Sequence, residues 1–211
     1  MEASNAPFRP ADLDTASDGG SKFLGFVPVG IVDYESKADQ YDWADEFLVV
    51  TLQIQDSQFP SEMKILGSYD KEPNGRIKTC TLMKQLYRFF DVLGFKGGPD
   101  VQGNMVDEKG EGIDNIATHL NQNFLPNNPL TPPMDYYAYV YKEPGRKDPS
   151  KAYTVVYPRL TLNNQKGREE LESFVAFLKG KNLIKEVAEG TTTNSGVPNN
   201  GAMDNSGATR F

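Results

Sequence analysis

The passage KILGSYDKEPNGRIKTCTLMKQLYRFFDVLGF, residues 64–95, decides the expected fold because its hydrophobic period changes partway along. Its first residues continue a strand predicted over 62–70, and a turn-forming KEPNGR segment follows. From residue 79 onward the apolar side chains return every three or four positions, which is the period of a helix. These side chains are Leu82, Leu86, Phe89 and Leu93. The passage therefore predicts a strand that leads through a turn into one helix.

Both ends of this helix carry sequence signals. Gly94 follows the last apolar position, and glycine commonly ends a helix because it adopts the left-handed conformation without strain. Thr79 or Thr81 offers a hydroxyl for the N-cap at the other end. We therefore predict a helix over 79–94.

Two further strands are predicted before this passage. Residues 26–35, FVPVGIVDYE, are apolar and β-branched, and their proline indicates a sheet edge or a bend. Residues 46–55, EFLVVTLQIQ, alternate between two faces, as a half-buried strand does. The polar loop between them, 36–45, carries Tyr41 and the only tryptophan, Trp43. The inward face of the second strand is expected to consist of Leu48, Val50, Leu52 and Ile54.

The chain beyond Gly94 alternates again between helix and strand signals. A short helix is expected over 111–124, followed by a proline-broken loop. Two strands, 135–142 and 152–162, are joined by a charged loop, and a last helix covers about 166–180.

Three strands, one helix and then a strand pair are the element order of an OB-fold, a five-stranded Greek-key barrel. The helix of that fold lies between the third and fourth strands, which is where 79–94 falls. We therefore expect an α+β protein that is mainly β: an OB-like barrel with added helices and disordered termini. An α+β sandwich with the same elements has the same order and stays open as an alternative.

Composition divides the chain into one domain and two tails. Residues 1–22 are polar and rich in small residues, which predicts a flexible N-terminal arm. Residues 188–211 are poor in aromatics until Phe211 and predict a disordered C-terminal tail. The OB-like domain, expected to bind nucleic acid, is then 23–187.

The charge is negative overall but unevenly spread. The formal net charge is −7, which argues against a protein that coats DNA through bulk positive charge. Residues 1–62 hold 12 acidic and three basic residues, whereas 63–185 hold 18 basic and 14 acidic residues. A local basic groove therefore remains compatible with the acidic total.

The sequence offers few residues suited to catalysis or to metal binding. A single cysteine, Cys80, excludes an internal disulfide and a cysteine-zinc cluster, and the single histidine, His119, makes most acid–base enzymes unsuited. The acidic run in the loop 36–45 lacks the pattern of a calcium loop. We predict no enzyme and no cofactor. A metal site in that run is the alternative, with Asp39, Asp42, Asp45 and Glu46 as ligands.

No apolar run approaches the ~20 residues of a membrane span, and the first residues lack a signal-peptide pattern. These features predict a soluble cytoplasmic protein.

The stretch MDYYAYVYKEPGRKDPSKAYTVVYPRL, residues 134–160, gathers six tyrosines and five basic residues. Alternation along 135–142 places Tyr137, Tyr139 and Tyr141 on one face, opposite small apolar side chains suited to a barrel interior. Single-stranded nucleic acid needs such rings for base stacking and nearby cations for its phosphates.

The predicted nucleic-acid site combines this hairpin with the loop before the second strand and the end of the third strand. Its stacking residues are Tyr137, Tyr139, Tyr141, Tyr153 and Tyr157, and its phosphate contacts are Lys142, Arg146, Lys147, Lys151 and Arg159. Trp43, Tyr69, Lys71 and Arg76 would extend the groove. Two alternatives stay open: the tyrosines pack beneath the last helix, or they form a protein–protein interface of a virion or interaction protein.

This layout resembles the OB-fold single-stranded DNA-binding proteins of bacteriophage replication and recombination modules. The resemblance covers roughly 23–187 and rests on the opening strand pair, the passage 64–95 and the tyrosine hairpin. It implies sequence-tolerant binding of single-stranded DNA, no catalysis, and a place in the host cytoplasm beside a polymerase, helicase or recombinase. It also implies that the C-terminal tail docks on such partners through Phe211.

Overall fold

The computed structural model describes residues 23–126, 131–145 and 148–187. The predicted arm, 1–22, and the predicted tail, 188–211, lie outside these ranges. Within the described ranges, no helix is both long and apolar enough to cross a membrane.

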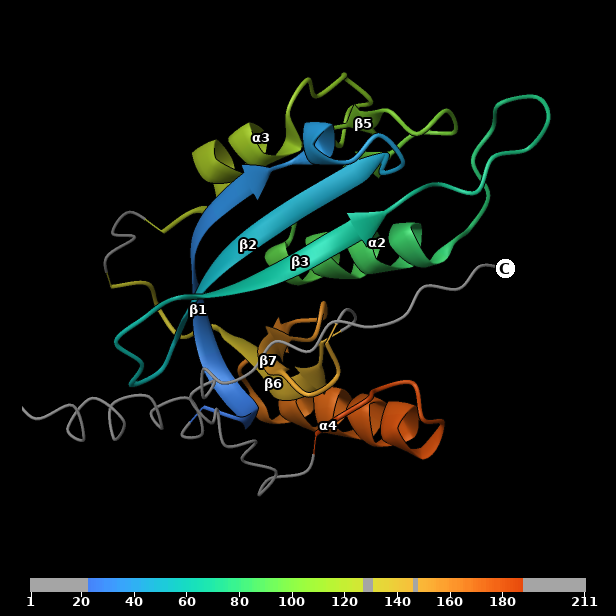
Figure 1. The fold of residues 1–211 in the computed structure, drawn as a ribbon. Coiled ribbons are helices and arrows are strands. Elements are labelled where there is room, and N and C mark those ends of the chain that lie inside the picture. The colour runs from blue at the N-terminus through green and yellow to red at the C-terminus, as the bar shows by residue number, and fades with distance from the viewer. Residues whose placement is uncertain (1–22, 127–130, 146–147, 188–211) are drawn as a thin grey trace, which may run out of the picture.

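Five strands close into a barrel (Figure 1). Their order around it is β1-β2-β3-β7-β6, and β6 returns to β1. Every neighbouring pair is antiparallel except β3 and β7, which run parallel where Met63 faces Val156. This arrangement confirms the predicted OB-like five-stranded barrel and excludes the open sandwich. The strands are β1 (Gly25–Ser36), β2 (Glu46–Ile54), β3 (Ser61–Gly67), β6 (Tyr136–Pro144) and β7 (Ala152–Val156).

Strand β1 belongs to both sides of the barrel because it changes partner halfway. Residues 25–29 pair with β6, and β2 takes over from Val29 onward. Pro28 lies next to this change and pairs with Tyr137 of β6, and the irregularity in the register of β1 falls between Ile31 and Asp33. Gly30 follows Pro28 at a close approach: a Cβ there would lie 2.7 Å from the carbonyl oxygen of Pro133.

The barrel interior is filled by the strand face that the alternation predicts. Leu48, Val50, Leu52 and Ile54 of β2 all belong to the main hydrophobic core, together with residues of every other barrel strand. Helix α2 (Thr81–Leu93) contributes Leu82, Leu86, Phe89 and Phe90 to the same core. Helix α3 (Ile116–Phe124) packs beside β1.

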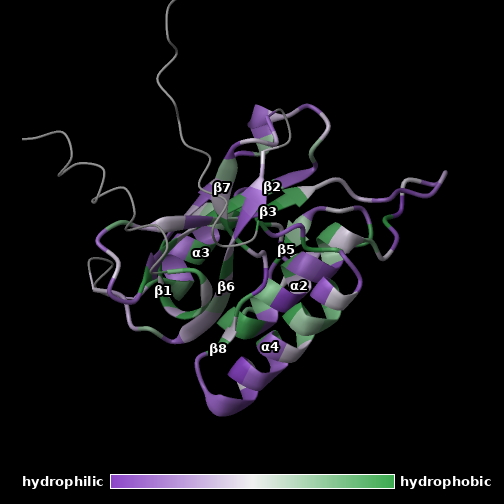
Figure 2. Cartoon of the chain, turned by 60° about the horizontal axis from the view of Figure 1, so that its bottom comes forward, coloured by the Kyte–Doolittle hydropathy of each residue, from purple (hydrophilic) through white to green (hydrophobic). Residues whose placement is uncertain are grey.

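Helix α4 (Gln165–Gly180) packs outside the barrel, against β6 and the short strand β8 (Thr161–Leu162). It forms a second hydrophobic core with the outer face of β6. Its first turn lies so close to β8 that a Cβ on Gly167 would be only 2.1 Å from the carbonyl oxygen of Leu162. In Figure 2, α2 and α4 each carry hydrophilic as well as hydrophobic residues.

The ends of the helices differ in part from the sequence expectation. Gly94 ends α2 in the left-handed conformation, with φ 82°, as predicted. The N-cap position is Cys80 rather than a threonine, and its side chain makes no capping hydrogen bond. Helix α3 begins only at Ile116, because Asn115 accepts a hydrogen bond from the Thr118 amide and caps the helix there.

The residues before α3 form turns and a small hairpin instead of helix. Its strands are β4 (Gly98–Pro99) and β5 (Met105–Val106). The carboxylate of Asp100 accepts hydrogen bonds from the amides of Gln102 and Asn104. Asp107 binds the amides of Lys109 and Glu111 in the same way. The Asp107 turn, together with the pairing of Val106 with Gly112 and the bond from the Ile113 amide to the Met105 carbonyl, takes 111–113 out of the expected helix.

The single strand predicted over 152–162 is divided into β7 and β8. Pro158 lies between them and has no amide hydrogen to donate to a sheet. The chain turns at this point, where the Arg159 amide donates to the Tyr157 carbonyl at 2.7 Å.

Candidate nucleic-acid interface

The tyrosine face, defined as Tyr137, Tyr139 and Tyr141, is not an open surface. Each ring is at least 92% buried, because α4 covers this side of β6 with Leu171, Val175 and Leu178. The alternation predicted from the sequence is correct, but the expectation that these rings are accessible is wrong. Bases cannot stack on them while α4 is in place.

The polar ends of these rings also have partners in the fold. The Tyr139 hydroxyl donates to Glu186 Oε1 at 2.6 Å, and Lys179 Nζ lies 4.9 Å from the ring centroid. Lys179 in turn forms an ion pair with Glu186 at 2.7 Å. Burial raises the pKa of the Tyr139 hydroxyl, as does its bond to Glu186, so the phenol stays protonated. These contacts fix the residues after α4 against β6.

Tyr157 and Arg159 belong to the same packing rather than to an open groove. The Tyr157 ring is half-buried, with its centroid 5.9 Å from that of Phe174 on α4. The Arg159 guanidinium lies 4.0 Å from the centroid of Phe174 and forms an ion pair with Glu170. The two side chains therefore link the chain between β7 and β8 to the helix.

The hairpin loop keeps only part of its predicted role. Tyr153 is exposed, and Lys151 forms an exposed ion pair with Asp148 at 3.8 Å. Lys142 is half-buried beside the segment after α4, where its carbonyl accepts the Val187 amide. Arg146 and Lys147 lie outside the described residues.

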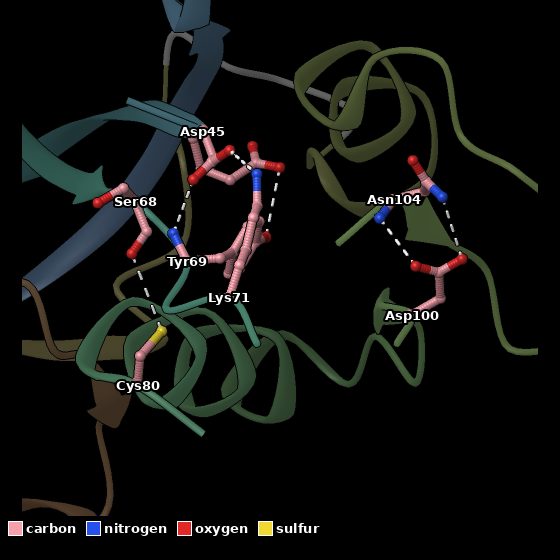
Figure 3. A network of polar contacts seen from close by, with 8 residues as sticks. Asp45, Ser68, Tyr69, Lys71, Cys80, Asp100 and Asn104 are labelled. Carbon is pink, nitrogen blue, oxygen red and sulfur yellow. Dashed lines mark hydrogen bonds and ion pairs between the residues drawn. The ribbon is translucent and has the colours of Figure 1, made fainter. Parts of the chain in front are cut away.

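The residues that follow β3 hold the loop between β1 and β2 in place (Figure 3). Tyr69 is buried, its amide donates to Asp45 Oδ2 at 2.7 Å, and its hydroxyl donates to Glu46 Oε1 at 3.4 Å. Lys71 Nζ forms an ion pair with Asp45 Oδ1 at 2.7 Å. Tyr69 and Lys71 are thus structural contacts of this loop and not free groove residues, whereas Arg76 is exposed.

The two acids at this position titrate differently. Burial raises the pKa of Glu46 to about 7; the Tyr69 hydrogen bond opposes this shift and the Asp45 charge adds to it. Burial also acts to raise the pKa of Asp45, but the hydrogen bonds from Lys71 and Tyr69 prevail and lower it. Asp45 therefore stays ionised at neutral pH, while Glu46 is close to its midpoint. Within the described ranges no three His, Cys, Asp or Glu side chains come together as a metal site.

Three rings from the same loop and from β2 form an aromatic stack, defined as Trp43, Tyr41 and Phe47. The Trp43 and Tyr41 centroids are 5.8 Å apart with planes at 30°, and the Tyr41 and Phe47 centroids are 5.7 Å apart at 22°. Phe47 is buried on the outer face of β2, whereas Trp43 at the far end is 59% exposed. The sequence placed the first two rings in one loop, and the alternation of β2 turned Phe47 outward, but nothing in it predicted that the three rings meet.

The outer face of β2 beside this stack carries paired charges. Val49 stands between Glu35 of β1 and Lys64 of β3 in the sheet register. Glu35 pairs with Lys37 at 2.9 Å, and Glu62 pairs with Lys64 at 3.0 Å. Val49 is only 1% exposed although it lies outside both hydrophobic cores of the described chain. We infer that the aliphatic parts of these charged side chains cover it.

No helix of the described chain crosses the near side of β2 and β3 in Figure 1. On this side Glu62 and Lys64 of β3 and Trp43 of the stack are exposed, whereas Phe47 and Val49 of β2 are buried. Lys37 and Lys64 were absent from the predicted site because their place became clear only from the strand register.

Comparisons with known proteins identify no relative. No protein-family model matches the chain. Searches among curated proteins and among solved structures likewise give no match. The OB-like assignment therefore rests on the order and pairing of the strands.

Proposed function

We propose that this chain is a non-catalytic protein that binds single-stranded DNA on the outer face of β2 and β3, next to the aromatic stack. The observation that carries the proposal is the stack itself, which projects Trp43 from the loop between β1 and β2 of a closed OB-like barrel. In OB-folds, oligonucleotides lie across strands two and three beside this loop.

The geometry of the stack indicates how a base would bind. Tyr41 lies between the other two rings, so its faces are already in contact. Trp43 is the terminal ring, and a base that stacks on its free side extends the existing column. Stacking of this kind contributes ~1–3 kcal/mol per base and tolerates any sequence.

We expect Lys37 and Lys64 to make the phosphate contacts on this face. Both are engaged with carboxylates in exposed ion pairs, which contribute only about 0–1 kcal/mol each. A phosphate can therefore replace the carboxylate at small cost. The surrounding acids, however, repel the DNA backbone, so the expected binding is moderate and depends strongly on salt.

The wider role stays part of this proposal. Work in phage DNA replication or recombination, with partners recruited through 188–211, is what the resemblance in layout implies. Phe211, the proposed docking residue of that tail, lies outside the described residues.

The test is fluorescence anisotropy of a labelled oligo-dT with the full-length protein at low and moderate salt. Trp43 is the only tryptophan, so quenching of its emission reports directly on the stack. Trp43→Ala should weaken binding about tenfold, as expected from one lost stacking contact. Phe177→Ala is a matched control, since that ring is 57% exposed but lies on α4. Absence of binding at low salt, or equal effects of the two substitutions, would contradict the proposal.

A further inference from the structure

A second feature, far along the chain from the aromatic stack, is a cleft between α2 and the start of α4. Its volume is about 330 Å³. Three cationic side chains line it: Arg88 from α2, Arg159 from the turn before β8, and Lys166 from α4. Two acids, Asp91 and Glu170, line it as well. Figure 2 shows α2 and α4 side by side in the view from this side.

The charges of this α2–α4 cleft do not cancel. Glu170 is paired with Arg159, and Asp91 lies 3.7 Å from Lys96. Arg88 and Lys166 are exposed and form no ion pair with any described residue. Both carboxylates of the lining thus have a cationic partner, and Arg88 and Lys166 are the lining cations without an ion pair among the described residues.

Arg159 is held in position before any ligand arrives, whereas Arg88 is exposed and lies farther from the same ring. Arg159 and Arg88 lie 4.0 Å and 5.7 Å from the centroid of the same Phe174 ring. The Arg159 side chain is only 13% exposed. Since ordering a long side chain costs conformational entropy, a guanidinium that is already fixed binds an anion with less loss.

A further group at the cleft favours an anion. The N-terminus of α4, capped by Asn164, opens onto it, and the helix dipole is positive at this end. Thr161 also lines the cleft, but its hydroxyl oxygen is inaccessible from the surface and is not counted among the ligands.

We propose that the α2–α4 cleft binds a phosphate group, with Arg88, Arg159 and Lys166 as its cationic ligands. Arginine suits this ligand because its planar fork donates two parallel hydrogen bonds to phosphate oxygens. The volume lies at the lower end for small-molecule pockets, which fits a phosphate with a sugar-sized group attached. The site is separate from the aromatic stack and does not depend on the proposed DNA-binding face.

The experiment is a titration of the ¹⁵N-labelled full-length protein followed by amide NMR shifts at Asn164, Lys166 and Gly167. Three probes separate the sources of the phosphate: inorganic phosphate, thymidine monophosphate, and short oligo-dT with or without a 5′-phosphate. Saturable shifts with inorganic phosphate support the site. Tighter binding of the nucleotide, or of the 5′-phosphorylated strand, identifies the source.

The variant that removes the free cations is Arg88→Gln with Lys166→Gln. Both residues are exposed, so the fold should persist, and phosphate affinity should fall about tenfold for each cation lost. Lys84→Gln with Lys181→Gln removes the same charge from exposed positions that do not line the cleft and should leave affinity unchanged.

Three results would overturn the proposal: no shift with any probe, the same shifts with sodium chloride at equal ionic strength, or equal losses in the two double variants. Trp43→Ala serves to separate the two sites. It should leave the phosphate shifts intact, so failure of the cleft and failure of the DNA-binding face can be distinguished.

Discussion

Two aromatic groups of this molecule differ in what packs on them. The tyrosine face on β6 contains three rings in alternate positions, and α4 covers all of them. The aromatic stack at β2 also contains three rings, but its outermost member, Trp43, is mostly exposed. An aromatic residue in a strand or loop therefore says little about binding until the element above it is known.

Polar partners distinguish the two groups further. The tyrosine hydroxyls are close to carboxylates of α4, the segment after it, and β6 itself, as with Glu172, Glu186 and Glu143. No ring of the stack takes part in the polar contacts of Asp45 and Glu46, which join the start of β2 to the residues after β3 (Figure 3). The first arrangement holds a helix on the barrel, whereas the second holds the end of the loop between β1 and β2.

The largest expected effect is on the tyrosine face. Tyr139→Ala should lower the free energy of unfolding by roughly 3–5 kcal/mol, because a fully buried ring is removed and a cavity remains. Adding Tyr141→Ala should unfold much of the protein instead of selectively weakening DNA binding. Urea denaturation followed by circular dichroism measures this loss. Tyr153→Ala, at an exposed ring on β7, should change stability by less than about 0.5 kcal/mol; equal effects of Tyr139 and Tyr153 would show that α4 does not cover the rings in solution.

The next effect concerns the pH dependence of stability, through Glu46 at the start of β2. The pKa of Glu46 is about 7 in the fold, above its ordinary 4.5, so the folded state binds more protons between these values. Stability should therefore fall as pH rises from about 4.5 to about 7, by at most about 3 kcal/mol. Glu46→Gln should remove this dependence and stabilise the protein above pH 7.

Asp45 does not contribute to the change in stability over this pH range. Its pKa is lowered, so its contribution to stability is lost only as pH falls below the ordinary aspartate range. Denaturation curves at several pH values, for wild type and Glu46→Gln, measure the difference. A Glu46→Gln protein with the wild-type slope between pH 4.5 and 7 would show that Glu46 is not the group responsible.

The third prediction concerns the aromatic stack, where DNA affinity and folding stability should respond differently to one substitution. Trp43→Ala should weaken oligo-dT binding by ~1–3 kcal/mol, yet change the free energy of unfolding by less than about 0.5 kcal/mol. This is the reverse of the behaviour expected for Tyr139. The same two measurements on both variants test the comparison directly, and a Trp43 variant that loses stability would assign the stack to the core.

The smallest expected effect is a gain in affinity for DNA. Glu35→Gln with Glu62→Gln should release Lys37 and Lys64 from their ion pairs and strengthen oligo-dT binding by up to about 1 kcal/mol per pair. If both lysines then contact phosphates, the salt dependence should steepen by about 1.4 units in log K against log salt. Anisotropy at several salt concentrations measures both quantities. Glu169→Gln with Glu172→Gln on α4 removes the same charge elsewhere, and an equal gain there would indicate a general charge effect.

Much of the barrel was accessible from the sequence because it depends on local periodicity. The alternation of 46–55 placed Leu48 and Val50 inward, and the change of period after residue 79 placed α2 between the third and fourth strands. Gly94 ended that helix as predicted, because a left-handed residue there favours glycine whatever the surroundings. The late start of α3 was not predicted, since the turn at Asp107 competes with helix through a side-chain hydrogen bond to the Glu111 amide.

The candidate site was less predictable because it depends on which elements meet. Tyr41 and Trp43 were recognisable as loop aromatics, but their stacking on Phe47 requires the loop to fold back over β2. Tyr69 and Lys71 were expected to line the groove, but their polar groups bind the carboxylates of Asp45 and Glu46. Contacts between residues distant in sequence leave no periodic signal in a single chain.

By itself, the sequence determined the order of the five barrel strands and three helices and the faces of the main strands, because these follow from spacing of two or about 3.6 residues along the chain. Tertiary structure alone decided which of those faces is covered. It placed α4 over the tyrosine face, left Trp43 exposed, and brought Arg88 of α2 beside Lys166 of α4. Burial is a property of the assembled layers, and so is the choice of which aromatic and charged residues remain free to bind.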